Sequence, residues 1–168
     1  MNKAVWGALS VVAMMALCGV GMATVRAQRA TACKYRIMAQ PSTADGRGAF
    51  PVGHDHHVGQ FNFAVTLGHN GPEGSFEYNE KNVPGQNIQH ILLHPVDHLT
   101  IQGHVAQFEG ATLWHDGHAR VRVIATDNGE HNDSLSLRVV GTDKTNAGKV
   151  LYEVGGILTT GAIHVYAH

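Results

Sequence analysis

Histidine and aspartate residues are concentrated in two short segments whose spacing could hold a metal ion. Residues 54–57 read HDHH, with three imidazoles and one carboxylate in a glycine-flanked stretch. Residues 115–118 read HDGH, with a histidine on either side of Asp-Gly. Neutral imidazole suits zinc, copper and nickel, so both segments are candidate transition-metal sites. The candidate ligands are His54, His56, His57, His115 and His118.

The second segment makes a geometric prediction. Asp116-Gly117 between two alternating runs favours a two-residue type I′ hairpin, since both central residues of that turn need positive φ. His115 and His118 would then face each other on adjacent strands with Cβ atoms about 4.5–5.5 Å apart. That separation lets two imidazoles share an ion at metal–nitrogen distances of about 2.0–2.1 Å. A third ligand would have to come from elsewhere, and the alternative is an exposed turn decorated by two histidines.

Two further patterns are weaker. His90, His94 and His98 have the spacing of one helical face, but Pro95 would break such a helix and the flanking residues read as strand. The segment TDNGEHND, residues 126–133, offers oxygen ligands for calcium but does not fit the EF-hand loop. Its alternative interpretation is a turn whose Asp and Asn side chains cap their own backbone.

Motifs of the common catalytic classes are missing from the sequence. It contains no Gly-x-Ser-x-Gly nucleophile elbow and no His-Glu-x-x-His zinc-protease motif. The part after residue 27 has no Cys-x-x-Cys pair. We therefore expect the protein not to be an enzyme.

The N-terminal residues have the organisation of a secretory signal peptide. A short positively charged start precedes an apolar run over residues 4–20, and Val25-Arg26-Ala27 places small residues where a signal peptidase reads. We expect residues 1–27 to be cleaved, which predicts a secreted or periplasmic protein without a membrane span. Cys33 would then be the only cysteine, either as a free thiol or in an intermolecular disulfide. The net charge of −1 and the lack of a basic stripe argue against a nucleic-acid partner.

The sequence after residue 27 divides into a leader or linker and a region of predicted strands. Residues 28–57 mix Pro, Gly, Ser and Asp without a sustained period, which indicates a leader or linker of loop. Residues 58–168 show apolar residues at every second position and turn residues at short spacing. Gly103-His104 suits a two-residue hairpin, and Asp127-Asn128-Gly129 closes another strand. The pattern predicts about eight antiparallel strands in hairpin, or meander, connections, arranged as a β-sandwich or a barrel.

Five segments of this region, in this order and spacing, resemble a bacterial β-domain family. They read GQFNFAV at 59–65, GSFEYNE at 74–80, VDHLTIQGHVAQFEG at 96–110, RVRVIATDNGEHNDSLSLRV at 120–139 and GGILTTGAIHVY at 155–166. The chain over residues 58–168 is similar to the domain catalogued as post-COAP, which follows choice-of-anchor domains in secreted and surface proteins. The resemblance implies an all-β extracytoplasmic module of no established catalytic activity.

The sequence leaves two candidate functions open. The first is a secreted, non-enzymatic β-scaffold of the cell surface or extracellular matrix whose loops carry any binding. The alternative is an extracytoplasmic binder or buffer of zinc, copper or nickel that uses the histidine clusters.

Overall fold

The computed structural model describes residues 40–168 except 54–55, 83–84, 86, 116 and 130. This part of the chain forms ten β-strands and no helix. The strands are β1 (Ser42–Val52), β2 (His57–Gly68), β3 (Gly71–Lys81), β4 (Asn87–Leu93), β5 (His98–Gln102), β6 (Val105–Trp114), β7 (Gly117–Thr126), β8 (Ser134–Gly141), β9 (Val150–Ile157) and β10 (Thr160–Tyr166). Accordingly, no helix of the described residues could cross a membrane.

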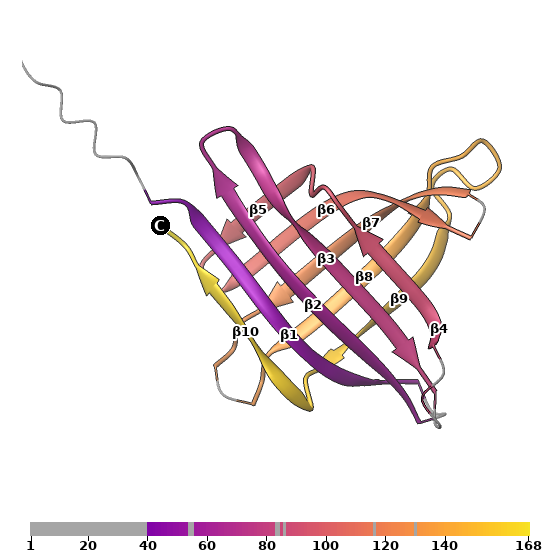
Figure 1. Cartoon of the computed structure of the whole chain (residues 1–168), viewed down its shortest axis with the longest axis horizontal. Helices are drawn as coiled ribbons and strands as arrows, with labels where there is room; N and C mark the ends of the chain where they lie inside the picture. The colour runs from indigo at the N-terminus through magenta and orange to yellow at the C-terminus, as the bar shows by residue number, and fades with distance from the viewer. Residues whose placement is uncertain (1–39, 54–55, 83–84, 86, 116, 130) are drawn as a thin grey trace, which may run out of the picture. The chain divides into compact units, whose positions relative to one another are not determined.

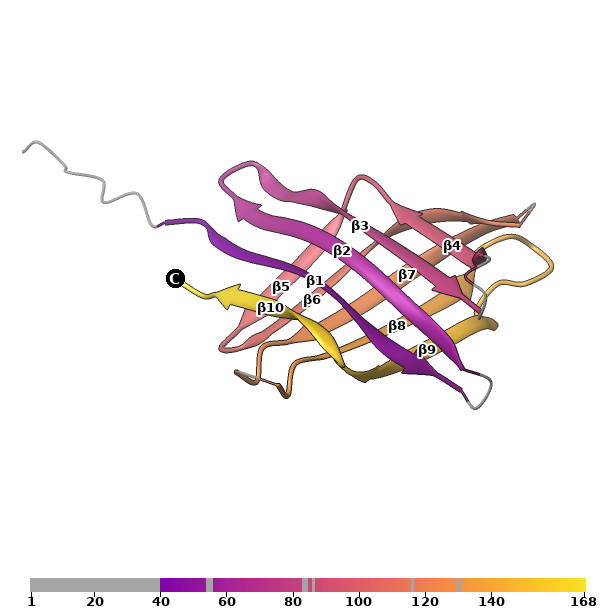
Figure 2. The ribbon, with the colours of Figure 1, turned by 60° about the horizontal axis from the view of Figure 1, so that its bottom comes forward.

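The strands form two five-stranded antiparallel sheets. Sheet A has the order β10-β1-β2-β3-β4, and sheet B has the order β5-β6-β7-β8-β9. The chain builds sheet A as a meander, crosses once to build sheet B, and returns with β10 to pair with β1. Figures 1 and 2 show the two sheets as layers, with β10 beside β1.

The core fills the space between the two sheets. Along β7, Ala119, Val121 and Val123 are buried while Arg120 and Arg122 point outward, as the two-residue period of a strand requires. Aromatic residues join the layers, among them Phe108, whose ring centroid is 5.2 Å from that of Phe63. A fully buried apolar side chain of this size stabilises the fold by about 1.5–3 kcal/mol.

The predicted all-β antiparallel architecture is confirmed, and of the two arrangements left open it is the sandwich. Ten strands replace the expected eight or so. One of the extra strands arises because the final run divides at Leu158-Thr159, where the chain passes from sheet B to sheet A.

The other extra strand is β1, and here the prediction of loop is wrong for residues 42–52. The inward positions of β1 include Ala44 and Gly46, which give almost no hydrophobic alternation. The strand forms because it pairs with β2 on one side and β10 on the other. The folded unit thus takes in residues that the sequence assigned to the leader. The predicted signal peptide, residues 1–27, and Cys33 lie outside the described residues.

Two predicted turns are confirmed. Gly103 has φ +56° in the two-residue loop between β5 and β6. The loop after β7 begins at Asp127, with Gly129 at φ +77°.

Candidate functional site

The hairpin at residues 113–121 forms, but its turn lies one residue earlier than predicted, which shifts the strand pairing by two residues. Trp114 pairs with Gly117 and Leu113 pairs with His118, so the connecting residues are 115 and 116. His115 lies in the turn with φ +49°, and its ring contacts Trp114. The expected cross-strand pair of His115 and His118 is therefore wrong.

The two histidines also line different hollows. His118 lines one with Leu113 and Thr112, whereas His115 lines another with Trp114 and Asp143.

The HDHH segment is described only in part, since His54 and Asp55 lie outside the described residues. His56 is exposed with φ +55°. His57 begins β2, and its Nδ1 is 2.8 Å from Oε1 of Glu80. Whether this segment binds a metal stays a prediction.

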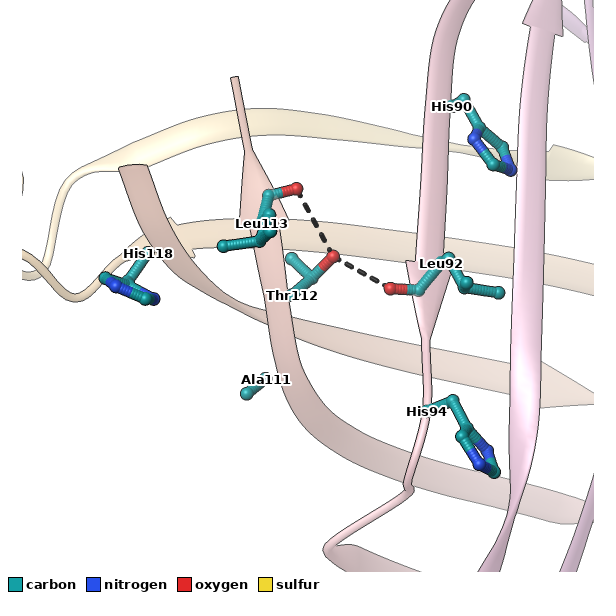
Figure 3. A pocket seen from close by; sticks show the side chains of 7 residues that line it. All are labelled: His90, Leu92, His94, Ala111, Thr112, Leu113 and His118. Carbon is teal, nitrogen blue, oxygen red and sulfur yellow. Dashed lines mark hydrogen bonds between the residues drawn. The ribbon is translucent and has the colours of Figure 1, made fainter. Parts of the chain in front are cut away.

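Three histidines line a hollow of about 480 Å³ between β4 and β6. They are His90, His94 and His118, and the hollow also includes the exposed Leu92 and Leu113. Figure 3 shows that the three imidazoles do not converge on one point.

Two of the polar side chains around this hollow, Thr112 and His90, bond to other protein groups. The hydroxyl of Thr112 donates to the carbonyl oxygen of Leu92 at 2.8 Å, across the seam between the sheets. His90 instead contacts Glu77, whose pKa is lowered by hydrogen bonds from Asn79 and His90. Among the described residues, no group of three or more His, Cys, Asp or Glu is placed to hold a metal ion.

A buried polar chain links the two sheets at the end where β2 begins. Tyr152 of β9 donates its hydroxyl proton to Oε2 of Glu80 at 2.5 Å, and the hydroxyl of Tyr78 lies 3.0 Å from that of Tyr152. Because the single proton of Tyr152 goes to Glu80, Tyr78 is the donor to Tyr152. His57 contacts the other carboxylate oxygen of Glu80. The chain is His57–Glu80–Tyr152–Tyr78.

Burial raises the pKa of both tyrosines in this chain. It raises the pKa of Tyr78 to about 12, with a smaller contribution from the nearby charge of Glu80. It raises the pKa of Tyr152 as well, and the hydrogen bond to Glu80 adds to the effect. Tyr152 therefore donates to a carboxylate that has little access to solvent, and Tyr78 donates to the hydroxyl of Tyr152.

The loop after β7, with its acidic side chains, attaches β10 to sheet B. Asp133 is buried and accepts the backbone N–H of Ile163 at 2.7 Å and that of Asn128 at 2.9 Å. Asp127 accepts from Val165 and, through its other oxygen, from Gly129. These carboxylates are committed to backbone donors, which supports the backbone-capping interpretation of this loop over a calcium site.

The outer face of sheet B carries a row of charges in register. Glu109, Arg122, Arg138 and Glu153 are successive partners across β6, β7, β8 and β9. Nε of Arg122 donates to Glu109 at 2.5 Å, and Nη2 of Arg138 donates to Glu153 at 2.9 Å. The two central arginines stand directly opposite each other, an arrangement that destabilises a sheet when nothing anionic lies over it.

A third arginine joins this row. Arg120 donates to Glu109 through Nε at 3.2 Å and to Asp97 through Nη2. Burial alone would raise the pKa of Glu109, but the hydrogen bonds from Arg122 and Arg120 outweigh it and hold that pKa below its ordinary value. Glu109 is thus an anion shared by two cations.

The three arginines line a hollow of about 480 Å³, which we call the arginine hollow. Its other walls include Val140 and the loop that follows β8, over residues 142–149. In the described part of the chain, Arg122 and Arg138 each make one side-chain hydrogen bond, which leaves most of their five N–H donors available. The arrangement can bind carboxylate, sulfate or phosphate oxygens, because guanidinium presents paired donors to such groups.

The arginine hollow was not anticipated from the sequence, although a signal was present. In RVRV, residues 120–123, and in LRV, residues 137–139, the charged residues alternate with apolar ones, so they must point away from the core. Their juxtaposition depends on the register between β7 and β8, which the sequence alone does not specify. Comparisons with protein-family models, with curated proteins and with solved structures find no match.

Proposed function

We propose that this protein is a non-enzymatic, extracytoplasmic β-scaffold of the cell surface or matrix that binds an anionic polymer at the arginine hollow. The location rests on the signal peptide expected over residues 1–27. The binding rests on one observation, the convergence of Arg120, Arg122 and Arg138 on a hollow in the outer face of sheet B.

The charge distribution favours an anionic ligand. The lining of the arginine hollow includes three guanidinium groups and one carboxylate, that of Glu109, while Asp97 and Glu153 pair with two of these arginines from outside the lining. The bordering loop adds the exposed Lys144 and Lys149, whereas the carboxylate of Asp143 in the same loop is occupied by backbone N–H groups of residues 145 and 146. Ion pairs as exposed as Arg138–Glu153 contribute little to stability, so their arginines can reorient toward a ligand at little cost.

The spacing of the arginines is compatible with binding carboxylate or sulfate groups that repeat along a polymer. Adjacent strands hold Arg122 and Arg138 in fixed register, so two neighbouring anionic groups can be met without ordering a loop first. The chain as a whole has a net charge of −1, so the attraction is local to this face.

The experiment measures binding of the protein to immobilised polygalacturonate and dextran sulfate, with neutral dextran as the blank. The double variant Arg122→Ala/Arg138→Ala should weaken binding by at least about 10-fold, because the loss of even one charge-assisted hydrogen bond costs about 1.5–3 kcal/mol. Binding should also weaken as salt rises.

Lys81→Ala is the control, since it removes a positive charge from β3 in the other sheet and leaves the arginine hollow intact. It should bind as wild type does. Equal binding by the double variant and this control would refute the proposal, as would equal retention on neutral dextran. Binding to polygalacturonate alone or to dextran sulfate alone identifies carboxylate or sulfate as the recognised group.

A further inference from the structure

The outer face of sheet A contains a second hollow, of about 580 Å³, which we call the sheet A hollow. It lies over β10, β1 and β2, on a different sheet from the arginine hollow. Its outward-facing lining residues are Asp45, Arg47, Asn62, Ala64, Ala162 and His164.

Small residues at two outward positions create this hollow. Asp45 pairs with Ala64 on one side and with His164 on the other. Arg47 pairs with Asn62 and with Ala162. Asp45 and Arg47 therefore each have an alanine as one cross-strand neighbour, and the surface between the longer side chains is low.

The backbone of β10 adds to the low floor at Gly161. This glycine has φ +92°, and a Cβ there would lie 2.0 Å from the carbonyl oxygen of Arg47. Only glycine allows β10 to lie this close to β1 at this point.

The polar groups around the sheet A hollow have no partners within the described part of the chain. The side chains of Asp45, Arg47 and Asn62 make no hydrogen bond or ion pair there. The contrast with the outer face of sheet B is informative, because every charged side chain of the row from Glu109 to Glu153 is paired. A carboxylate, a guanidinium and an amide thus surround one hollow with free donors and acceptors.

His164 lines the hollow, and a second aromatic ring lies beside it on β10, just outside the lining. His164 and Tyr166 lie two residues apart on β10 and share its outer face, with ring centroids 6.4 Å apart and planes inclined by 32°. Tyr166 is 50% exposed, so its ring face is accessible to a ligand.

We propose that the sheet A hollow binds a neutral saccharide unit. Carboxylate, amide and guanidinium groups are planar and can each contact two neighbouring hydroxyl groups of a sugar ring. The rings of Tyr166 and His164 offer apolar faces to the C–H groups of the same unit. One carboxylate and one guanidinium give no net charge, so the complementarity is to a hydroxyl-rich neutral ligand. The volume lies within the range of small-ligand sites, about 300–1,000 Å³.

This inference goes beyond the proposed function, because it concerns another face and another ligand chemistry. With both hollows occupied, the sandwich would hold a neutral saccharide on sheet A and an anionic polymer on sheet B.

The experiment is a titration of the isotope-labelled protein with cellobiose, maltose and N,N′-diacetylchitobiose, followed by amide NMR shifts. At least one sugar should give saturable shifts at Asp45, Ala64 and His164, with a Kd on the order of 1 mM or tighter. Asn62→Ala and Tyr166→Ala should each weaken that Kd about 10-fold, whereas Ser75→Ala, an exposed change on β3 outside the hollow, should not alter it.

The absence of saturable shifts with all three sugars would overturn the inference, and so would an unchanged Kd in both variants. Both residues are exposed or lie on the outer face, so the variants should fold, and their amide spectra check this directly. Arg122→Ala/Arg138→Ala should bind the sugar as wild type does. Failure of the polygalacturonate and dextran sulfate experiment would therefore leave the sugar result standing, and the reverse also holds.

Discussion

Replacing Tyr152 by phenylalanine tests the buried polar chain most directly, because it removes one oxygen and leaves the ring. Tyr152 donates to the buried carboxylate of Glu80 and accepts from Tyr78, whose side chain is fully buried. The variant loses a hydrogen bond to a charged group, which contributes about 1.5–3 kcal/mol. It also leaves the hydroxyl of Tyr78 without a partner, at a cost of about 1–3 kcal/mol.

With partial relaxation, we expect the free energy of unfolding to fall by about 3 kcal/mol, which corresponds to a decrease in Tm of roughly 10 °C. Urea titration followed by tryptophan fluorescence is a suitable assay, since the indole of Trp114 lies 5.4 Å from the ring of Tyr152. Tyr166→Phe is the matched control, because Tyr166 is half-exposed and its hydroxyl bonds to no other described residue. It should change stability by no more than about 0.5 kcal/mol.

A double-mutant cycle sharpens the result. In the Tyr78→Phe background no hydroxyl is left unpaired, so Tyr152→Phe should cost at least about 1 kcal/mol less than it does in wild type. If Tyr152→Phe is as stable as Tyr166→Phe, or if the two changes are simply additive, the buried chain does not hold the sheets together as described.

Three further outcomes are expected. Since the pKa of Tyr78 is raised to about 12 in the folded protein, its contribution to stability is complete below pH 10 and is lost as the pH rises toward 12. Urea titrations across that window should show a decline of about 1.4 kcal/mol per pH unit from this residue, reduced in Tyr78→Phe. Asp133→Asn replaces an acceptor of the Ile163 N–H by a donor or weaker acceptor and should cost about 1–3 kcal/mol, with faster hydrogen exchange at Ile163; unchanged exchange would contradict the assigned bond. The HDHH metal hypothesis predicts that micromolar Zn²⁺ raises the Tm of wild type but not of His56→Ala/His57→Ala, and an unchanged wild-type Tm rejects it.

The strands whose inward residues are large were predictable from the sequence, and those with small inward residues were not. Along β7 the alternation of Val121 and Val123 with Arg122 is unambiguous. Along β1 the inward Gly46 removes the same signal, so that strand depends on neighbours that are distant in sequence.

Register and long-range contacts account for what the sequence could not provide. Placing the β6–β7 turn one residue earlier than predicted shifts the strand pairing by two residues, so that His118 lies opposite Leu113 instead of His115. The contact between Glu80 and Tyr152 joins residues that are 72 positions apart, and no local pattern predicts it. The same holds for the cross-strand neighbours of Arg122.

The attachment of β10 by Asp127 and Asp133 also bears on how copies of this protein behave when crowded together. An outermost strand normally offers a row of free N–H groups with which a strand of another molecule can pair. Here the amides of Ile163 and Val165 on that side are already bound by carboxylates of the same chain. These two bound amides therefore oppose edge-to-edge growth of fibres through β10, so that crowded copies of the protein should not polymerise along this strand.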